Sequence, residues 1–217
     1  MLEGTEGVGK TTQLRHLAAR TQAAGIPLVT VREPGGTPIG DEIRRLLLQT
    51  SLHIVPRAEA LLFMASRAQL VDDVVRPALA QGRVVVADRF FLATYAYQVA
   101  GRGLEEEEVR RSNRFATDAV MPDLTLLLDL PEDEGLARVT SRGSHDRIER
   151  SGDDFHQRVG SAFRTFARPE WQRQHPECGQ IELVNANGTE REVADRIWLA
   201  LASRWPETFR PEVASQL

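Results

Sequence analysis

The segment that most constrains the fold of this chain is the glycine-rich run G-T-E-G-V-G-K-T-T at residues 4–12. It matches the pattern G-x-x-x-x-G-K-[ST], in which a turn leads into a helix. The backbone NH groups of such a turn and the positive end of the helix dipole face one point, and the lysine adds a mobile full charge. We therefore predict a cradle for nucleotide phosphates, rather than a turn that merely begins an ordinary helix. The candidate phosphate-binding residues are Gly4, Thr5, Glu6, Gly7, Val8, Gly9, Lys10, Thr11 and Thr12.

The stretch before this turn is unusually short. A buried parallel strand should lead into the cradle, yet only Met1, Leu2 and Glu3 precede Gly4. A central strand has about five residues. We expect either that the natural chain begins upstream, or that the first strand is a stub that leaves its neighbour partly unpaired.

Length and composition predict one domain. A chain of 217 residues with 41% hydrophobic residues can bury a single core, and we assign it to residues 1–205, followed by a flexible tail at 206–217. A net charge of -4 argues against a general nucleic-acid binder. The single cysteine, Cys178, excludes an intramolecular disulfide. With no run of about 18 apolar residues, these features favour a cytoplasmic chain without a membrane partner.

Apolar runs alternate with helical patterns along the chain. Runs rich in Val, Leu and Ile, of the kind found in strands buried on both faces, occur at 28–31, 84–87, 124–128 and 181–184. Helices are expected at 10–24, 40–49, 57–80, 105–119, 132–141, 153–173 and 189–204. This order predicts an α/β fold of three layers, a parallel sheet with helices on both faces, of the P-loop NTPase type. The ligand site should lie at the carboxyl ends of the strands.

Two other features have no expected catalytic role. The four acids at 105–108 precede Arg110 and Arg111, as at a helix N-terminus with i,i+4 ion pairs, so we interpret them as a solvated face. The five histidines show no metal-ligand spacing. We expect His175 and Cys178 to lie at the surface.

Four further segments give a family resemblance. They are R-E-P-G-G-T at 32–37, L-L-F-M-A-S-R at 61–67, D-R-F at 88–90 with A-Y-Q at 96–98, and D-R-I-E at 146–149. Together they resemble the thymidylate kinase (dTMP kinase) family over most of residues 1–204. The resemblance implies transfer of the γ-phosphoryl group of ATP to dTMP with Mg²⁺, and the family commonly forms homodimers.

The resemblance also suggests how dTMP would be held. It places Phe63 and Arg67 on the thymine ring and its O4, although from the residues alone Phe63 could be a core aromatic and Arg67 a surface ion pair. Arg89 can grip a monophosphate through two parallel bonds, which a lysine cannot. Tyr97 would pack under the sugar. The full set of candidate dTMP-binding residues is Glu6, Arg32, Pro34, Phe63, Arg67, Arg89, Thr94, Tyr97 and Gln98.

Candidate catalytic residues surround the cradle. Thr11 is expected to offer its hydroxyl to Mg²⁺, and Asp88 could hold the ion through water or orient the acceptor. Because the cradle carries Val8 where some relatives carry an arginine, a polar segment at 140–152 is expected to act as a lid, with Arg142 and Arg147 contacting ATP. Ala93 and Gly160 depart from the family pattern. The catalytic set is Lys10, Arg89, Glu6, Asp88, Arg142 and Arg147.

Two alternatives to a kinase remain open at this point. One is a nucleotide-dependent switch such as a GTPase, although the guanine-reading N-K-x-D pattern is absent from the sequence. The other is a homologue that folds without catalysing. Turnover without an acceptor would favour the switch.

Overall fold

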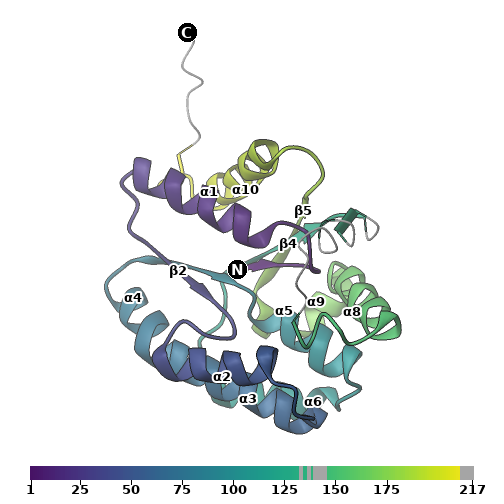
Figure 1. The fold of residues 1–217 in the computed structure, drawn as a ribbon. Coiled ribbons are helices and arrows are strands. Elements are labelled where there is room, and N and C mark those ends of the chain that lie inside the picture. Colours follow the sequence, from purple (N-terminus) through teal and green to yellow (C-terminus); the bar gives the residue numbers. More distant parts are fainter. Residues whose placement is uncertain (132–133, 136–137, 139–145, 211–217) are drawn as a thin grey trace.

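The computed structural model describes residues 1–131, 134–135, 138 and 146–210, and shows a parallel sheet in the order β2-β3-β1-β4-β5 (Figure 1). Every strand pairing is parallel. The predicted sheet of the α/β fold is confirmed, and its strands lie within a residue or two of the expected runs. The strands are β1 (Leu2–Glu3), β2 (Leu28–Arg32), β3 (Val84–Asp88), β4 (Leu124–Asp129) and β5 (Gln180–Asn185).

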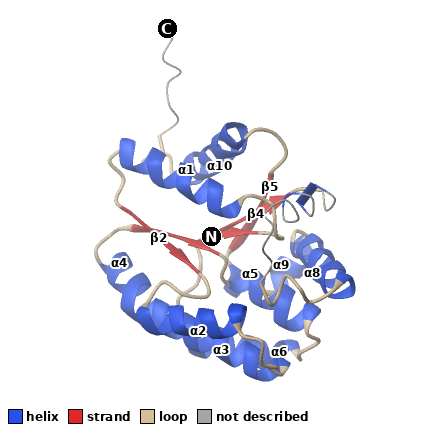
Figure 2. Ribbon diagram, in the orientation of Figure 1, coloured by secondary structure: helices blue, strands red, loops and turns tan. Residues whose placement is uncertain are grey.

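Helices cover both faces of this sheet (Figure 2). Helices α1 (Lys10–Ala23) and α10 (Glu190–Arg204) pack together on one face. The other face carries α3 (Pro56–Leu70), α6 (Glu106–Thr117) and α8 (Asp153–Phe166), with α2 (Pro38–Gln49) packed on α3. Shorter elements are the π-helices η1 (Val71–Val75) and η2 (Tyr95–Gly101), helices α4 (Arg76–Ala80), α5 (Phe91–Thr94) and α9 (Pro169–Gln174), and a 3-10 turn at Pro176–Cys178. Among the described helices, none has the length and apolar character needed to cross a membrane.

Strand β4 shows how the two faces are filled. Leu126 and Leu128 belong to the core under α1 and α10, whereas Leu127 belongs to the aromatic core around α5, η2 and α8. This alternation follows from the two-residue period of a strand. Burial on both faces explains why the run is almost wholly apolar.

The first strand is a stub at the centre of the sheet. Leu2 pairs with Asp88 on one side and Leu126 on the other, and Glu3 pairs with Leu127. The NH groups of Leu126 and Arg89 donate to the carbonyls of Met1 and Leu2 at 2.9 and 3.0 Å, and these bonds join the stub to its neighbours on either side. The strand is thus short but sufficient to place Gly4 at the carboxyl edge of the sheet.

Two expected helices are interrupted, and one helical segment was not predicted. The stretch 57–80 contains the π-helical turn η1 between α3 and α4. The stretch 153–173 breaks because Pro169 forces the residue before it, Arg168, out of the helical region, to a ψ of 134°. Residues 91–101 form α5 and η2, where the sequence analysis predicted binding residues but no helix.

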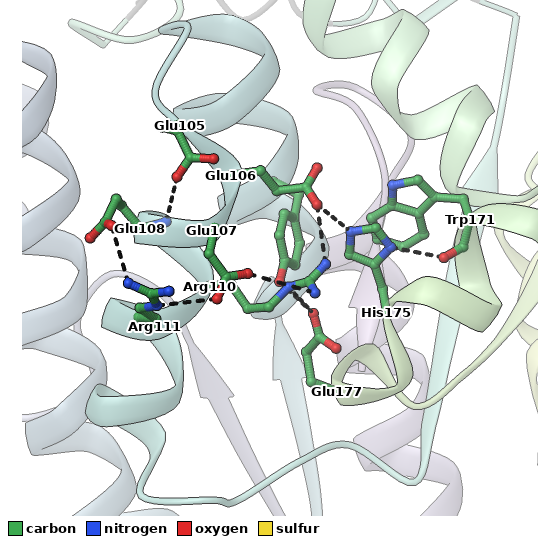
Figure 3. A network of polar contacts seen from close by, with 10 residues as sticks. Glu105, Glu106, Glu107, Glu108, Arg110, Arg111, Trp171, His175 and Glu177 are labelled. Atoms are coloured by element: carbon green, nitrogen blue, oxygen red, sulfur yellow. Dashed lines mark hydrogen bonds and ion pairs between the residues drawn. The ribbon is translucent and has the colours of Figure 1, made fainter.

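The acidic run begins α6 as predicted, but one of its acids has a buried partner (Figure 3). Arg110 and Arg111 pair with Glu106 and Glu107 at i,i+4. Glu106 also bonds Nε2 of His175 at 3.0 Å.

The expectation that His175 and Cys178 lie at the surface is wrong. His175 is 2% exposed and Cys178 is fully buried. The imidazole stacks on Trp171 at 3.6 Å between ring centroids (Figure 3), and this contact draws the segment into the core.

The expected tail is packed at its start. Phe209 is buried against Trp198 and Trp205, and the indole NH of Trp198 donates to the carbonyl of Arg210 at 3.0 Å. Residues up to Arg210 are therefore packed against α10, and the flexible tail at 206–217 stays a prediction. Residues 211–217 lie outside the described part of the chain.

Candidate nucleotide site

A cavity of about 310 Å³ lies at the carboxyl ends of the central strands. Its volume is at the lower end of the range for ligand pockets, about 300–1,000 Å³. The structure brings the predicted cradle and the predicted acceptor residues together in its wall. The lining includes Glu6, Gly7, Gly9, Lys10, Thr11, Thr12, Arg32, Pro34, Phe63, Arg67, Asp88, Arg89, Thr94, Tyr97 and Gln98.

The turn that forms the cradle requires glycine at specific positions. Gly4 has a φ of 136°, and a Cβ there would lie 2.6 Å from the carbonyl oxygen of Leu128. Gly7 has a φ of 78°, and its Cβ would lie 2.1 Å from the carbonyl oxygen of Gly135. A side chain at either position would be strained and would collide with backbone. The glycines therefore let β1 pass directly into α1.

Lys10 is held inside this turn. Its Nζ donates to the carbonyls of Gly4 and Thr5 at 2.9 and 2.7 Å. Burial, and after it the Arg89 guanidinium, lowers the pKa of Lys10 to about 8, although nearby carboxylates oppose the shift. A phosphate at this point would supply the negative charge that best favours the protonated amine.

Thr11 and Asp88 form the oxygen-rich part of the cavity. The Thr11 hydroxyl donates to Oδ2 of Asp88 at 2.8 Å, joining the start of α1 to the end of β3. Among the described residues, no group of three or more acidic, histidine or cysteine side chains is arranged so that it could hold a metal ion. Mg²⁺ in kinases uses one or two protein oxygens together with phosphates and waters. A hydroxyl beside a carboxylate fits that requirement.

Arg89 lies between the cradle and the residues predicted to bind the acceptor. Its guanidinium donates to the Gly4 carbonyl and to Oε1 of Glu6, each at 3.3 Å, and lies 4.9 Å above the Tyr97 ring. Tyr97 donates its hydroxyl to the same Glu6 oxygen. Burial acts to raise the pKa of Glu6, but Arg89 and Tyr97 outweigh it and hold that pKa below its usual value. Glu6 is thus an ionised acceptor among donors, which accounts for an acid within an anion-binding turn.

Arg67 is almost completely buried in the cavity wall. It forms an ion pair with Glu33, with Nε donating at 2.8 and 3.0 Å. Its other donors reach Thr94, Asn113 and the carbonyl of Phe90. A guanidinium has five N–H groups, so all are used, and a bond to a base would have to share or replace one of these contacts.

Gln98 lines the cavity and carries a buried polar group without a partner among the described residues. This group is the side-chain amide nitrogen, Nε2. Buried polar groups are normally paired. Phe63, half-buried beside the same cavity, offers an apolar surface. Arg32 and Pro34 line the rim, where the guanidinium of Arg32 lies 4.0 Å from Asp41.

Arg147 points away from the cradle in this structure. Its guanidinium donates to Glu59 on α3 at 2.5 Å and to the carbonyl of Leu47 at 2.6 Å. Glu59 is also held by Arg102, at 2.9 Å. The other candidate lid arginine, Arg142, lies outside the described residues.

Several residues of the site were not found by the sequence analysis. Glu33 lies within the quoted R-E-P-G-G-T segment, so its position was known but its pairing was not. Asn113 lies on α6, 46 residues from its partner Arg67, and no local pattern indicates it. Arg44, which lines the cavity and donates to the Pro34 carbonyl at 2.8 Å, also has no sequence signal beyond helical spacing.

Comparisons with known proteins agree with this geometry. The family model for thymidylate kinase matches residues 2–185. A thymidylate kinase from Syntrophotalea carbinolica is 45% identical over 209 residues, covering 93% of this chain and 94% of its own. One from Deinococcus radiodurans is 44% identical over 203 residues, covering 94% and 95%. The crystal structure of thymidylate kinase from Ehrlichia chaffeensis matches with a TM-score of 0.72 at 26% identity, over 92% of this chain and 96% of that one.

Proposed function

The chain belongs to the thymidylate kinase family, and we propose on this basis that it transfers the γ-phosphoryl group of ATP to dTMP, giving dTDP and ADP. The observation that carries this proposal is a single cavity lined both by the phosphate cradle and by Phe63, Arg89 and Gln98. A donor and an acceptor nucleotide need to meet in one enclosed site for direct transfer.

The donor side would be held by the cradle. The backbone of residues 4–12 and the N-terminus of α1 would bind the phosphates of ATP. Lys10 would exchange its carbonyl partners for phosphate oxygens. Thr11 and Asp88 would hold Mg²⁺, which neutralises charge on the phosphates.

The acceptor side would be organised around Arg89. Its guanidinium can bind the dTMP phosphate through two parallel bonds, while Glu6 and Tyr97 fix its orientation. The free amide of Gln98 would donate to an acceptor on the thymine edge, beside Phe63. Arg67 and Thr94, which bond each other at 2.8 Å, would complete that wall.

We also propose that Arg142 and Arg147 contribute positive charge near ATP. For Arg147 this requires release from Glu59. Closure of the lid over ATP would then be coupled to a movement of the segment that carries Arg147.

An acceptor panel tests the function. ADP release from ATP should require Mg²⁺ and dTMP, be much weaker with dUMP, and be negligible with CMP or GMP. Arg89→Ala should lower kcat/KM for dTMP by at least about tenfold, because a charged hydrogen bond contributes about 1.5–3 kcal/mol. ATP hydrolysis that proceeds equally well without an acceptor would instead favour a nucleotide-dependent switch.

We further propose a cytoplasmic homodimer. A cytoplasmic location agrees with a single cysteine whose thiol is buried. Large apolar side chains are exposed on three neighbouring helices: Ile39 and Leu46 on α2, Leu61 on α3 and Phe115 on α6. Phe115 is 88% exposed. Exposed apolar surface of this kind is typical of an interface.

A further inference from the structure

We propose that Glu3 is a positioning residue that aims Arg89 at the acceptor phosphate, an inference that rests on the function proposed above. Glu3 ends β1 and directly precedes Gly4 of the cradle. Its side chain is fully buried, and the mechanism described so far does not use it. A buried carboxylate beside a catalytic turn requires a physical reason.

The carboxylate of Glu3 holds the backbone that follows Arg89. Its Oε1 accepts the NH of Phe90 at 2.6 Å and the NH of Ala93 at 3.2 Å. These two NH groups belong to the first turn of α5, where a helix lacks internal acceptors. Glu3 therefore anchors the start of α5 to the central strand.

Arg89 needs such an anchor because its backbone is strained. It has a φ of 69°, in the left-handed region that a residue with a side chain rarely adopts. The peptide group before it is bound by the NH of Arg89 donating to Leu2 at 3.0 Å. The peptide group after it is bound to Glu3. The end of β1 thus fixes both sides of Arg89 and directs its guanidinium to Gly4 and Glu6.

The contact depends on one oxygen in the right place rather than on a charge. Both NH groups donate to Oε1, whereas Oε2 has no partner among the described residues. Burial raises the pKa of Glu3, although Arg89 opposes the shift. The amide oxygen of a glutamine can accept the same two bonds. Aspartate keeps the charge, but its side chain is shorter by one methylene, so its oxygen would no longer reach the two NH groups.

Binding of dTMP and of thymidine, measured by calorimetry on the full chain, tests this role. Because Arg89 acts on the phosphate, Glu3→Leu and Glu3→Asp should weaken dTMP binding by at least about tenfold and leave thymidine binding within about twofold. Glu3→Gln should stay within about threefold of the wild type for both ligands. In an Arg89→Ala background, Glu3→Leu should cause little additional loss of dTMP affinity.

A second buried polar residue provides the control. Thr125 on β4 donates to the carbonyl of Cys178 at 2.8 Å, away from Arg89. Thr125→Val should lower Tm without changing the ratio of the affinities for dTMP and thymidine. Equal losses for dTMP and thymidine in both Leu and Asp variants, or a Gln variant as impaired as these, would overturn the role of Glu3. If Arg89→Ala itself left dTMP binding unchanged, the acceptor assignment would fall together with this inference.

Discussion

At the scale of single residues, the unpaired amide of Gln98 makes a specific prediction about thymine recognition. Gln98→Leu roughly keeps the volume of the side chain but removes the buried amide donor of a cavity-lining residue, which has no partner among the described residues. We expect KM for dTMP to rise by about tenfold, with a smaller change in kcat, because a neutral hydrogen bond contributes about 1 kcal/mol and more when its loss leaves a partner unpaired. Steady-state kinetics at saturating ATP measures this split.

The matched control for Gln98 is Gln81. That residue is exposed at the end of α4 and does not line the cavity, since it precedes β3 whereas Asp88 lies at the carboxyl end of that strand. Gln81→Leu should leave both constants unchanged. An unchanged KM in Gln98→Leu would show that the amide does not contact dTMP.

The lowered pKa of Lys10 predicts that ATP binding is linked to proton uptake. Its pKa in the free protein is about 8, and phosphates would raise it. ATP binding above pH 8 should then take up a proton, and affinity should fall by up to about tenfold per pH unit as pH rises from 8. Calorimetry in buffers of different ionisation enthalpy counts the protons, which should approach one per ATP near pH 9.

The variant Lys10→Met serves as the reference for this linkage. It lacks the titrating amine, so proton uptake in this pH range should disappear together with much of the ATP affinity. Persistence of the same proton uptake in Lys10→Met would assign the linkage to another group.

At the scale of elements, local sequence patterns predict what is determined locally. The apolar run of β4 and the cradle before α1 are correctly placed, because burial on two faces and a glycine turn each leave a pattern in neighbouring residues. The break before Pro169 could have been predicted from the proline, but the apolar spacing around it favoured one continuous helix. The burial of His175 could not be predicted from local sequence, since it depends on packing with Trp171 and on Glu106, which is 69 residues away.

The residues of the candidate site likewise fall into those that the sequence predicts and those that it does not. Positions at strand ends, such as Asp88 and Arg89, could be predicted because parallel strands end at one edge of the sheet. Their partners could not. Arg67 is satisfied by groups 23 to 46 residues distant, and Arg147 by Glu59, 88 residues away. Only the packing of α3 against its neighbours brings these groups together.

The Glu59 cluster makes a prediction about how elements are joined. Glu59 is buried and pairs with Arg102, which follows η2, and with Arg147, which lies within the expected lid segment at 140–152. Glu59→Gln should lower the free energy of unfolding by about 3 kcal/mol, because removing one partner leaves buried charges uncompensated. Urea denaturation at pH 7 measures this change.

An exposed pair gives the comparison for Glu59. Glu42 and Arg45 form an i,i+3 pair on the surface of α2, and such pairs contribute at most about 1 kcal/mol. Glu42→Gln should therefore have a much smaller effect. Equal effects of the two substitutions would mean that the Glu59 cluster does not hold the elements together.

At the scale of the whole molecule, the three-layer arrangement leaves one set of helices with apolar side chains in solvent. Helices α2, α3 and α6 lie together on the side of the sheet opposite α1 and α10 (Figure 1). The cavity lies between this group and the cradle, with Phe63 and Arg67 coming from α3. Association through these helices would therefore rest on the same α3 that supplies part of the proposed acceptor wall.

The proposed homodimer can be tested through Phe115. A glutamate at this position would place a charge in an apolar interface, which has a large desolvation cost. We expect Phe115→Glu to shift the protein from dimer to monomer in sedimentation velocity at micromolar concentration, with secondary structure retained by circular dichroism. Leu199, exposed on α10 on the opposite side of the sheet, supplies the control, since Leu199→Glu should leave the dimer intact. A wild-type chain that sediments as a monomer at all concentrations would contradict the proposal, and a dimer disrupted only by Leu199→Glu would transfer the interface to the α1 and α10 face.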